Sequence, residues 1–223
     1  FLGTNKKVIG VKPTYSSVYR HATGLKADVI ALPLNADATQ NIDAMIEATR
    51  KNYRDVGLVY LVNPNNPTGI VVNKSDVQKL LDGIPEDVPV LVDEAYHHFV
   101  QDPNYETAIP HILEGRPVIV ARTFSKIYGM AAIRLGYGIA SPEMIDKMRP
   151  HQTGNVSVLA RWGGVAALKD TESEATFLKD TLDLRNKTVA ELEAMGHRIL
   201  PSETNFFFVY TGRPVAEVQE AFR

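Results

Sequence analysis

The chain has 223 residues, which is long enough for one large domain or about one and a half domains. Apolar residues make up 44% of the sequence and charged residues 22%, as in an ordinary soluble globular protein. The formal net charge of −2 and the scattered Lys and Arg residues give no indication of a nucleic-acid or anionic-membrane partner, and the absence of cysteine excludes disulfides, a thiolate nucleophile and a cysteine-based metal site.

Short apolar runs rich in β-branched residues alternate with helical patterns in the first part of the chain. Helices are predicted over 42–52 and 75–81, the second with Ser75 as its N-cap and Asp76 in its first turn. The predicted strands are 7–11, 29–34, 58–62, 90–92, 118–121 and 135–140. This alternation predicts an α/β fold whose large domain has a mostly parallel sheet flanked by helices.

The pattern changes near Pro142, Pro150 and Gly154. A long helix with an apolar stripe over 177–195 is predicted to stop at Gly196, followed by strands at 198–200 and 205–210 and a helix at 215–222. We therefore expect residues 1–150 to belong to the large domain. Residues 151–223 are expected to supply a connecting helix and the start of a small C-terminal α+β domain.

The segment Arg122-Thr123-Phe124-Ser125-Lys126 ends one of the predicted strands, and Arg134 follows eight residues after Lys126. A lysine at the end of an apolar run can have its amine desolvated and directed at a carbonyl, which suits Schiff-base chemistry. The hydroxyls and Arg134 suit a phosphate group. The segment therefore indicates a covalent pyridoxal phosphate site, although Ser-x-Lys alone is weak because most lysines after a strand are solvated.

Two further segments place polar residues after predicted strands. One is Asn63-Pro64-Asn65-Asn66-Pro67-Thr68-Gly69, which predicts a rigid, non-helical turn. The other is Asp93-Glu94-Ala95-Tyr96, which delivers a carboxylate and a phenol. Each could be an ordinary loop or helix cap by itself. Because the carboxyl ends of parallel strands line one crevice, we expect Asn66, Asp93, Tyr96 and Lys126 to converge.

Together, in this order and spacing, the three segments resemble those of the fold-type I aminotransferases of class I/II, most closely the histidinol-phosphate aminotransferase branch. The resemblance covers essentially the whole chain. It implies pyridoxal 5'-phosphate as cofactor, with residues 1–150 as the central part of the cofactor-binding domain. Lys126 is then the lysine that forms the Schiff base and moves the α-proton, Asp93 pairs with the ring nitrogen, and Asn66 and Tyr96 donate to the ring phenolate oxygen.

The resemblance also implies a phosphate site and a stacking residue. Arg134 would bind the phosphate through its guanidinium, with Ser125 and Thr123 as hydroxyl donors. Tyr15, in Pro13-Thr14-Tyr15, would stack on the cofactor ring, although Tyr15 and Tyr19 could instead form one side of a helix.

Three other features carry less weight. His97 and His98 are adjacent, and adjacent side chains on a regular element face different ways, so we expect structural or pocket-rim residues and no metal site. Asn205 resembles a residue near the family's substrate-carboxylate site, but a core strand is the safer interpretation. The sequence has no nucleotide-type glycine fingerprint, so it gives no indication of NAD or ATP binding.

The resemblance implies transamination between an L-amino acid or a related amine, such as histidinol phosphate, and a 2-oxo acid, in a homodimer. A decarboxylase or lyase of the same fold, or a regulatory module with that fold, are the alternatives. The phosphate-binding turn and the substrate-carboxylate arginine are expected outside the chain, before Phe1 and after Arg223. We expect a cytoplasmic protein, with any signal peptide in the part before Phe1, and no apolar run approaches the roughly 20 residues of a membrane helix.

Overall fold

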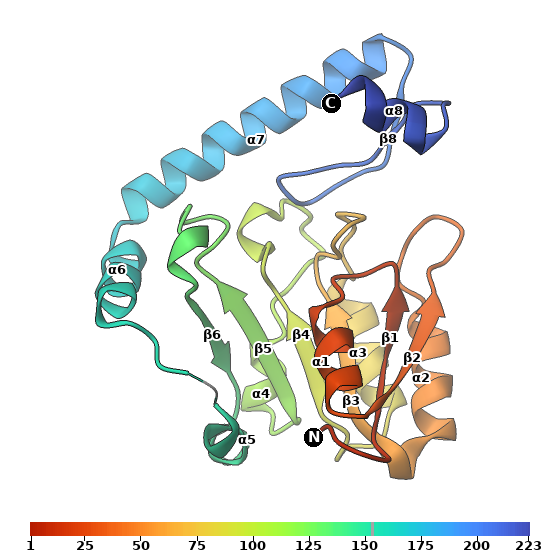
Figure 1. Cartoon of the computed structure of the whole chain (residues 1–223), viewed down its shortest axis with the longest axis vertical. Helices are drawn as coiled ribbons and strands as arrows, with labels where there is room; N and C mark the ends of the chain where they lie inside the picture. The colour runs from red at the N-terminus through yellow and green to blue at the C-terminus, as the bar shows by residue number, and fades with distance from the viewer. Residues whose placement is uncertain (153) are drawn as a thin grey trace.

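The computed structural model describes residues 1–152 and 154–223. A six-stranded sheet with the order β2-β1-β3-β4-β5-β6 forms its centre (Figure 1). Neighbouring strands from β2 to β5 run parallel, whereas β6 pairs with β5 in the antiparallel sense. The strands are β1 (Lys7–Lys12), β2 (Asp28–Pro33), β3 (Val56–Val62), β4 (Val90–Asp93), β5 (Val118–Thr123) and β6 (Gly136–Ile139). The predicted α/β architecture with a mostly parallel sheet is confirmed.

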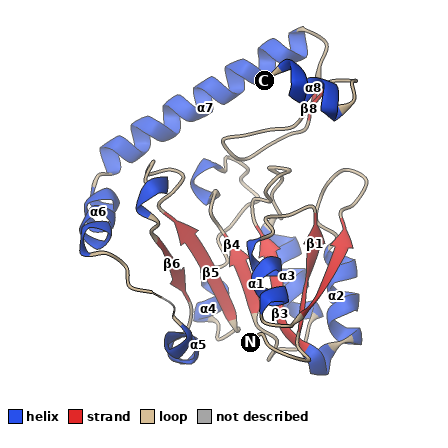
Figure 2. Cartoon of the chain, viewed as in Figure 1, coloured by secondary structure: helices blue, strands red, loops and turns tan. Residues whose placement is uncertain are grey.

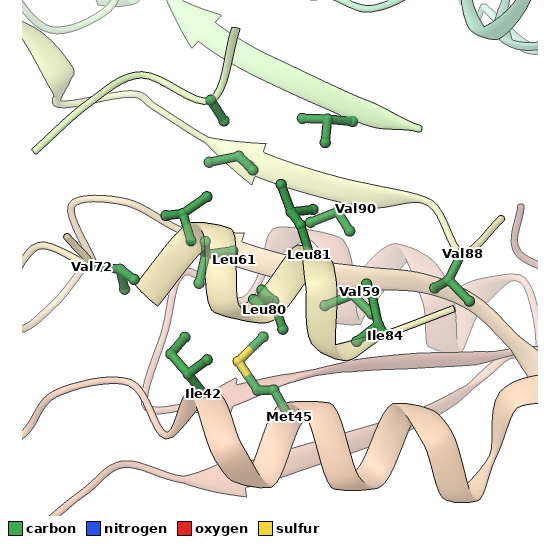
Figure 3. Close-up of a cluster of buried hydrophobic side chains, with 14 of the residues drawn as sticks. Ile42, Met45, Val59, Leu61, Val72, Leu80, Leu81, Ile84, Val88 and Val90 are labelled. Atoms are coloured by element: carbon green, nitrogen blue, oxygen red, sulfur yellow. The ribbon is translucent and has the colours of Figure 1, made fainter. Parts of the chain in front are cut away.

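Helices cover both faces of this sheet, as the secondary-structure colouring of Figure 2 shows. One face packs against α2 (Ile42–Lys51), α3 (Lys74–Gly83) and α4 (Ile109–Leu113), and the other packs against α1 (Ser17–Gly24). Figure 3 shows Met45 of α2 and Leu80 of α3 close to Val59 of β3. Because every residue of β3 is buried, its sequence is a continuous apolar run without polar alternation.

The cap of α3 differs from its prediction. Asn73, in extended backbone conformation, accepts a hydrogen bond from the Asp76 N–H at 2.8 Å. The helix therefore begins at Lys74, and Ser75 lies inside the first turn, where its hydroxyl donates to the Asn73 side chain at 2.7 Å. The prediction of Ser75 as N-cap is wrong because asparagine two residues earlier already satisfies the free N–H group.

The later part of the chain begins with α5 (Pro142–Met148) and α6 (Val158–Lys169) and continues with α7 (Thr171–Ala194). In Figure 1, α7 passes above the carboxyl ends of the strands. It ends before Gly196, whose φ of +87° suits the predicted stop. A two-stranded sheet of β7 (Arg198–Ile199) and β8 (Val209–Tyr210), with α8 (Val215–Ala221), follows. The division into domains at residue 150 stays a prediction.

The predicted strand over 205–210 is largely wrong, because only Val209 and Tyr210 pair. The hydroxyls of Ser202 and Thr204 both donate to the Phe206 carbonyl, at 2.5 and 2.9 Å. These bonds hold Phe206 in a local turn in place of a strand ladder. The apolar stripe of α7 also remains largely uncovered, with Phe177 and Leu184 exposed.

The segment that contains this turn lies against the loops of the large sheet. The Glu203 N–H donates to the Gly69 carbonyl at 2.8 Å, and the Glu203 carboxylate accepts from the Gln101 N–H at 2.6 Å. Arg185 of α7 donates to the Gln101 side chain and to the Thr204 carbonyl, both at 3.0 Å. The two sheets are thus joined by hydrogen bonds at the carboxyl edge.

In the described part of the chain, no helix combines the length and apolar character needed to cross a membrane.

Candidate active site

Three adjacent parallel strands bring the predicted site residues to one edge of the sheet. The Asn63 to Gly69 turn follows β3, Asp93 is the last residue of β4, and Lys126 lies three residues after β5. The register pairs Val62 with Asp93 and Asp93 with Ala121, so the strands end at the same level. Figure 1 shows these three strand ends at one edge of the sheet. The convergence predicted from the parallel pattern is present in the structure.

Asp93 is held through both carboxylate oxygens. Oδ1 accepts a hydrogen bond from the Ala95 N–H at 3.1 Å, and Oδ2 accepts one from the Tyr60 hydroxyl at 3.3 Å. Burial raises the pKa of Asp93, and these two hydrogen bonds oppose the rise, as does the charge of Lys126. A buried carboxylate of this kind can pair with a cationic ring nitrogen.

Lys126 and Tyr96 lie together. The Lys126 Nζ is 5.0 Å from the centroid of the Tyr96 ring, which suits a cation–π contact. Asn66 donates from its Nδ2 to the Tyr96 hydroxyl at 3.3 Å. The Phe206 ring meets the Tyr96 ring edge to face, with centroids 5.0 Å apart. The amine is thus next to a phenol whose position is fixed from two sides.

Arg134 and Ser125 meet beside this group. Arg134 has a left-handed backbone (φ 58°, ψ 50°), is exposed, and places Nη1 3.5 Å from the Ser125 Oγ and 2.9 Å from the Ala131 carbonyl. The Ser125 N–H donates to the Thr123 hydroxyl oxygen at 3.0 Å, which closes a tight turn. A guanidinium next to a hydroxyl can bind an anion such as a phosphate.

Tyr15 is less closely placed. It precedes α1 and is 47% exposed, whereas Tyr19 lies in α1 and packs against Tyr60 with ring centroids 5.7 Å apart. The two tyrosines therefore do not form one side of a helix. Stacking by Tyr15 on a cofactor ring stays a prediction.

The two histidines lie in the 3-10 helix η2 (His97–Phe99), and their ring centroids are 3.7 Å apart. Burial lowers the pKa of His97 to about 3 and also lowers the pKa of His98, so both rings are neutral near pH 7. Among the residues that the structure describes, no group of three or more His, Cys, Asp or Glu side chains is arranged to hold a metal ion.

Comparison with known proteins identifies the family. Residues 1–223 match the family model for aminotransferase class I and II. The chain belongs to this family. It is 34% identical to histidinol-phosphate aminotransferase of Halalkalibacterium halodurans and 36% identical to that of Symbiobacterium thermophilum, in each case over 99% of the chain. It spans 59% and 60% of these two relatives, so it represents about three fifths of their length.

Solved structures of histidinol-phosphate aminotransferases share the fold. Histidinol-phosphate aminotransferase from Clostridium acetobutylicum superposes with a TM-score of 0.80 at 25% identity and covers 92% of the chain and 61% of that structure. The Sinorhizobium meliloti enzyme, in complex with pyridoxal-5'-phosphate, superposes with a TM-score of 0.89 over 98% of the chain and 59% of its own. At 24% identity the second match shows the fold alone.

Sequence reasoning missed two features of this candidate site. The first is Tyr60, which stands in an apolar strand and is the one aromatic residue between Leu58 and Val62. The second is a buried ion pair, in which Arg122 donates to the Glu94 carboxylate at 2.8 Å. Glu94 and Arg122 both stand inside the motifs described above, and opposite charges beside two predicted strand ends were the signal that could have identified the pair.

Proposed function

We propose that the protein is a pyridoxal-phosphate-dependent aminotransferase that transfers an amino group from an L-amino acid or related amine to a 2-oxo acid. The convergence of Asp93, Lys126 and the Asn66–Tyr96 pair at one sheet edge carries the proposal. These groups come from three strand ends that are far apart in sequence. A purely structural role would not require an amine, a carboxylate and a phenol at the same place.

The chemistry of these donors fits the cofactor group by group. The buried Asp93 carboxylate suits the ring nitrogen, and the Lys126 amine suits the aldehyde. The Tyr96 hydroxyl and the Asn66 amide suit the phenolate oxygen. Arg134 with Ser125 suits the phosphate, because a guanidinium stays charged at any working pH.

Each residue then has a physical task. Asp93 would keep a proton on the ring nitrogen, because a neighbouring negative charge favours the cationic ring. When bound, pyridoxal phosphate supplies an electron sink for the bond that breaks at the substrate α-carbon. The Lys126 Nζ would hold the cofactor covalently and, after an incoming amine releases it, take the α-proton and return it as general acid. Tyr96 would orient the ring through its hydroxyl.

The names of the relatives suggest the first donor to test. Two of them, described above, are named histidinol-phosphate aminotransferases, and a relative from Cutibacterium acnes with 35% identity is named an aromatic amino acid aminotransferase. We propose histidinol phosphate as the donor and a homodimer as the assembly. The exposed apolar side chains of α6, among them Leu159 and Trp162, support an interface. The cytoplasmic location stays a prediction from the sequence.

The test is a half-reaction screen of the full-length protein loaded with pyridoxal phosphate. Histidinol phosphate, aromatic amino acids and a panel of other L-amino acids are mixed singly with the protein, and the visible absorbance of the bound cofactor is followed. We expect rapid loss of this absorbance with one donor and its recovery on addition of a 2-oxo acid. Mass spectrometry should identify the oxo product of the donor.

The same screen separates the alternatives. Release of carbon dioxide with formation of an amine from the donor would identify a decarboxylase, and no response to any donor, with no bound cofactor, would favour a regulatory or binding module. Lys126→Ala serves as the control, because it removes the amine and should abolish the absorbance change. A Lys126→Ala protein that responds like the unsubstituted one would contradict the proposed site.

A further inference from the structure

Tyr60 is the residue of β3 that reaches the candidate site. Side chains two apart on a strand share a face, so Tyr60 and Val62 of β3 lie on the same face as Leu91 and Asp93 of β4. The Tyr60 side chain is almost fully buried, at 1% exposure, and its hydroxyl lies 3.3 Å from the Asp93 Oδ2. The phenol therefore approaches the carboxylate from the neighbouring strand.

A phenol in this position requires a partner. The residues on either side of Tyr60 are aliphatic, and a buried hydroxyl without a hydrogen bond is costly. Asp93 supplies the acceptor. Burial and the nearby Asp93 charge raise the pKa of Tyr60 above its ordinary value, so the hydroxyl stays protonated and donates at any working pH.

The ring of Tyr60 is fixed by its surroundings. Tyr19 of α1 meets it edge to face at an interplanar angle of 81°, and the Tyr19 hydroxyl is itself tied to the Val11 carbonyl at 2.8 Å. At Gly10 a Cβ atom would collide with the Tyr19 hydroxyl and with the Tyr60 carbonyl, so glycine leaves room for this packing. This packing holds the side chain in place and with it the hydroxyl oxygen beside Asp93.

The two hydrogen bonds to Asp93 fix the plane of its carboxylate. The Ala95 N–H occupies one lone pair of Oδ1 and the Tyr60 hydroxyl occupies one of Oδ2. The other lone pair of each oxygen is left for a ligand. A carboxylate that is held in one plane can meet a ring nitrogen without rearranging first.

We propose that Tyr60 is a positioning residue, whose hydroxyl holds the Asp93 carboxylate in the orientation and charge state that a ring nitrogen of the cofactor requires. This inference rests on the proposed function, because it assigns Tyr60 to the same site. It adds a residue of β3 to the groups contributed by β4, β5 and the loops. Tyr60 acts through Asp93, to which its hydroxyl donates.

The experiment compares Tyr60→Phe with the unsubstituted full-length protein. The substitution removes the hydroxyl and keeps the ring that packs on Tyr19. Two quantities are measured: the dissociation constant for pyridoxal phosphate, and the 15N chemical shift of bound cofactor labelled at the ring nitrogen. We expect affinity to fall roughly tenfold or more, as for loss of a hydrogen bond to a charged group. We also expect the nitrogen signal to move toward that of a neutral pyridine.

Tyr53→Phe is the matched control. Tyr53 also donates its hydroxyl to an aspartate, Asp87, at 2.9 Å, but lies just before β3 at the opposite end of the strand from the candidate site. Its substitution should leave both quantities unchanged. The 15N shift is read after unbound cofactor has been removed, so cofactor released by partial unfolding of a variant does not contribute to it.

Asp93→Asn separates failure of this inference from failure of the proposed function. If Asp93→Asn shifts the nitrogen signal while Tyr60→Phe leaves the signal unchanged and the affinity within twofold, the role of Tyr60 is overturned and the aminotransferase site stands. If the unsubstituted protein does not bind pyridoxal phosphate, or Asp93→Asn leaves the nitrogen signal in place, the site assignment itself fails and the role of Tyr60 fails with it.

Discussion

At the scale of single residues, a substitution of Asp93 can test the importance of its negative charge while the size of the side chain is kept. Asp93→Asn keeps the size of the side chain and one oxygen that can accept from the Ala95 N–H, but it removes the negative charge and the oxygen that accepts from the Tyr60 hydroxyl. Because the proposed role depends on that charge, removal of the substrate α-proton should slow by about a hundredfold or more, equivalent to ~3 kcal/mol. Stopped-flow measurement of the half-reaction checks this. A rate near that of the unsubstituted enzyme would refute the role of Asp93.

Lys126 can be identified by chemical labelling. Borohydride reduction of the cofactor-loaded enzyme, followed by digestion and peptide mass mapping, should place the pyridoxyl group on Lys126. Lys147 provides the comparison, because it is exposed and paired with Glu143 at 2.7 Å and has no place in the site. The assignment is wrong if Lys147 or another surface lysine carries the label and Lys126 does not.

His97 should make stability depend on pH. Burial lowers its pKa from 6.5 to about 3, with further contributions from His98 and Arg122. As pH falls through 6.5, His97 binds a proton in the unfolded chain but stays neutral in the folded chain. The stability present above pH 6.5 is therefore progressively lost toward pH 3. Between pH 7 and pH 5, His97 alone should lower the free energy of unfolding by up to about 2 kcal/mol.

The measurement for His97 is denaturant unfolding at both pH values. His97→Gln should flatten the difference between pH 7 and pH 5, whereas His21→Gln, at an exposed position in α1, should not. An equal pH dependence in the unsubstituted protein and in His97→Gln would contradict this prediction.

At the scale of elements, the Glu94–Arg122 pair joins the ends of β4 and β5. Glu94, with its side chain 1% exposed, accepts hydrogen bonds from Arg122, Thr107 and the Ala108 N–H. Glu94 follows Asp93 directly, and Arg122 precedes Lys126 by four residues, so the pair links the two strand ends that carry the candidate site, in addition to their backbone pairing. Glu94→Gln leaves Arg122 without its counter-charge and should destabilise the protein by about 3 kcal/mol.

Glu143→Gln is the comparison for this pair. Glu143 is also bonded to a cation, Lys147, but both side chains are well exposed, at 79% and 59%. Exposed pairs contribute little, so this substitution should leave the free energy of unfolding unchanged within error. Denaturant unfolding of both variants tests whether the buried Glu94–Arg122 pair stabilises the protein more than the exposed Glu143–Lys147 pair. Equal losses of stability in Glu94→Gln and Glu143→Gln would contradict this prediction.

The strands of the sheet could be predicted because burial on both faces leaves a continuous apolar run, as in β3. The convergence of Asn66, Asp93 and Lys126 could also be predicted, since it depends only on parallel strands ending at one edge. The turn at Phe206 could not, because the hydroxyls of Ser202 and Thr204 override the strand propensity of an aromatic run.

The contact between Tyr60 and Asp93 could not be predicted from the sequence either. The two residues are 33 positions apart, and their meeting depends on the register between β3 and β4. Periodicity shows that a strand exists but does not fix its register against a neighbour. The exact placement of Tyr15 is similar, because a short unpaired segment between β1 and α1 sets its direction.

At the scale of the whole molecule, Gly69 is where the small sheet's segment meets the large sheet's loops. Gly69 has a φ of +76°, and a Cβ atom there would collide with the Ser202 side chain. Gly69→Ala should therefore lower the free energy of unfolding for two reasons. The left-handed backbone contributes about 1–2 kcal/mol, and the collision with Ser202 contributes about 1–3 kcal/mol. Because Asn66 lies in the same turn, cofactor affinity should also fall.

Gly115→Ala isolates the first of these costs. Gly115 has a φ of +85°, with nothing within 4 Å of the position of a Cβ atom. Its substitution should lower the free energy of unfolding by the backbone cost alone and leave cofactor affinity unchanged. If Gly69→Ala and Gly115→Ala are equally destabilising and neither affects cofactor binding, the contact with Ser202 has no energetic importance.

The antiparallel direction of β6 has a consequence for the linear sequence. β5 ends at Thr123 and β6 begins at Gly136, and these two residues are paired partners. The loop between β5 and β6 therefore begins and ends at the same edge of the sheet. Arg134, near the end of this loop, consequently lies beside Ser125, near its beginning. A parallel sixth strand would begin at the far edge and would need a crossover of a dozen or more residues. The short interval of eight residues between Lys126 and Arg134 therefore indicates, from the sequence alone, that β6 runs antiparallel to β5.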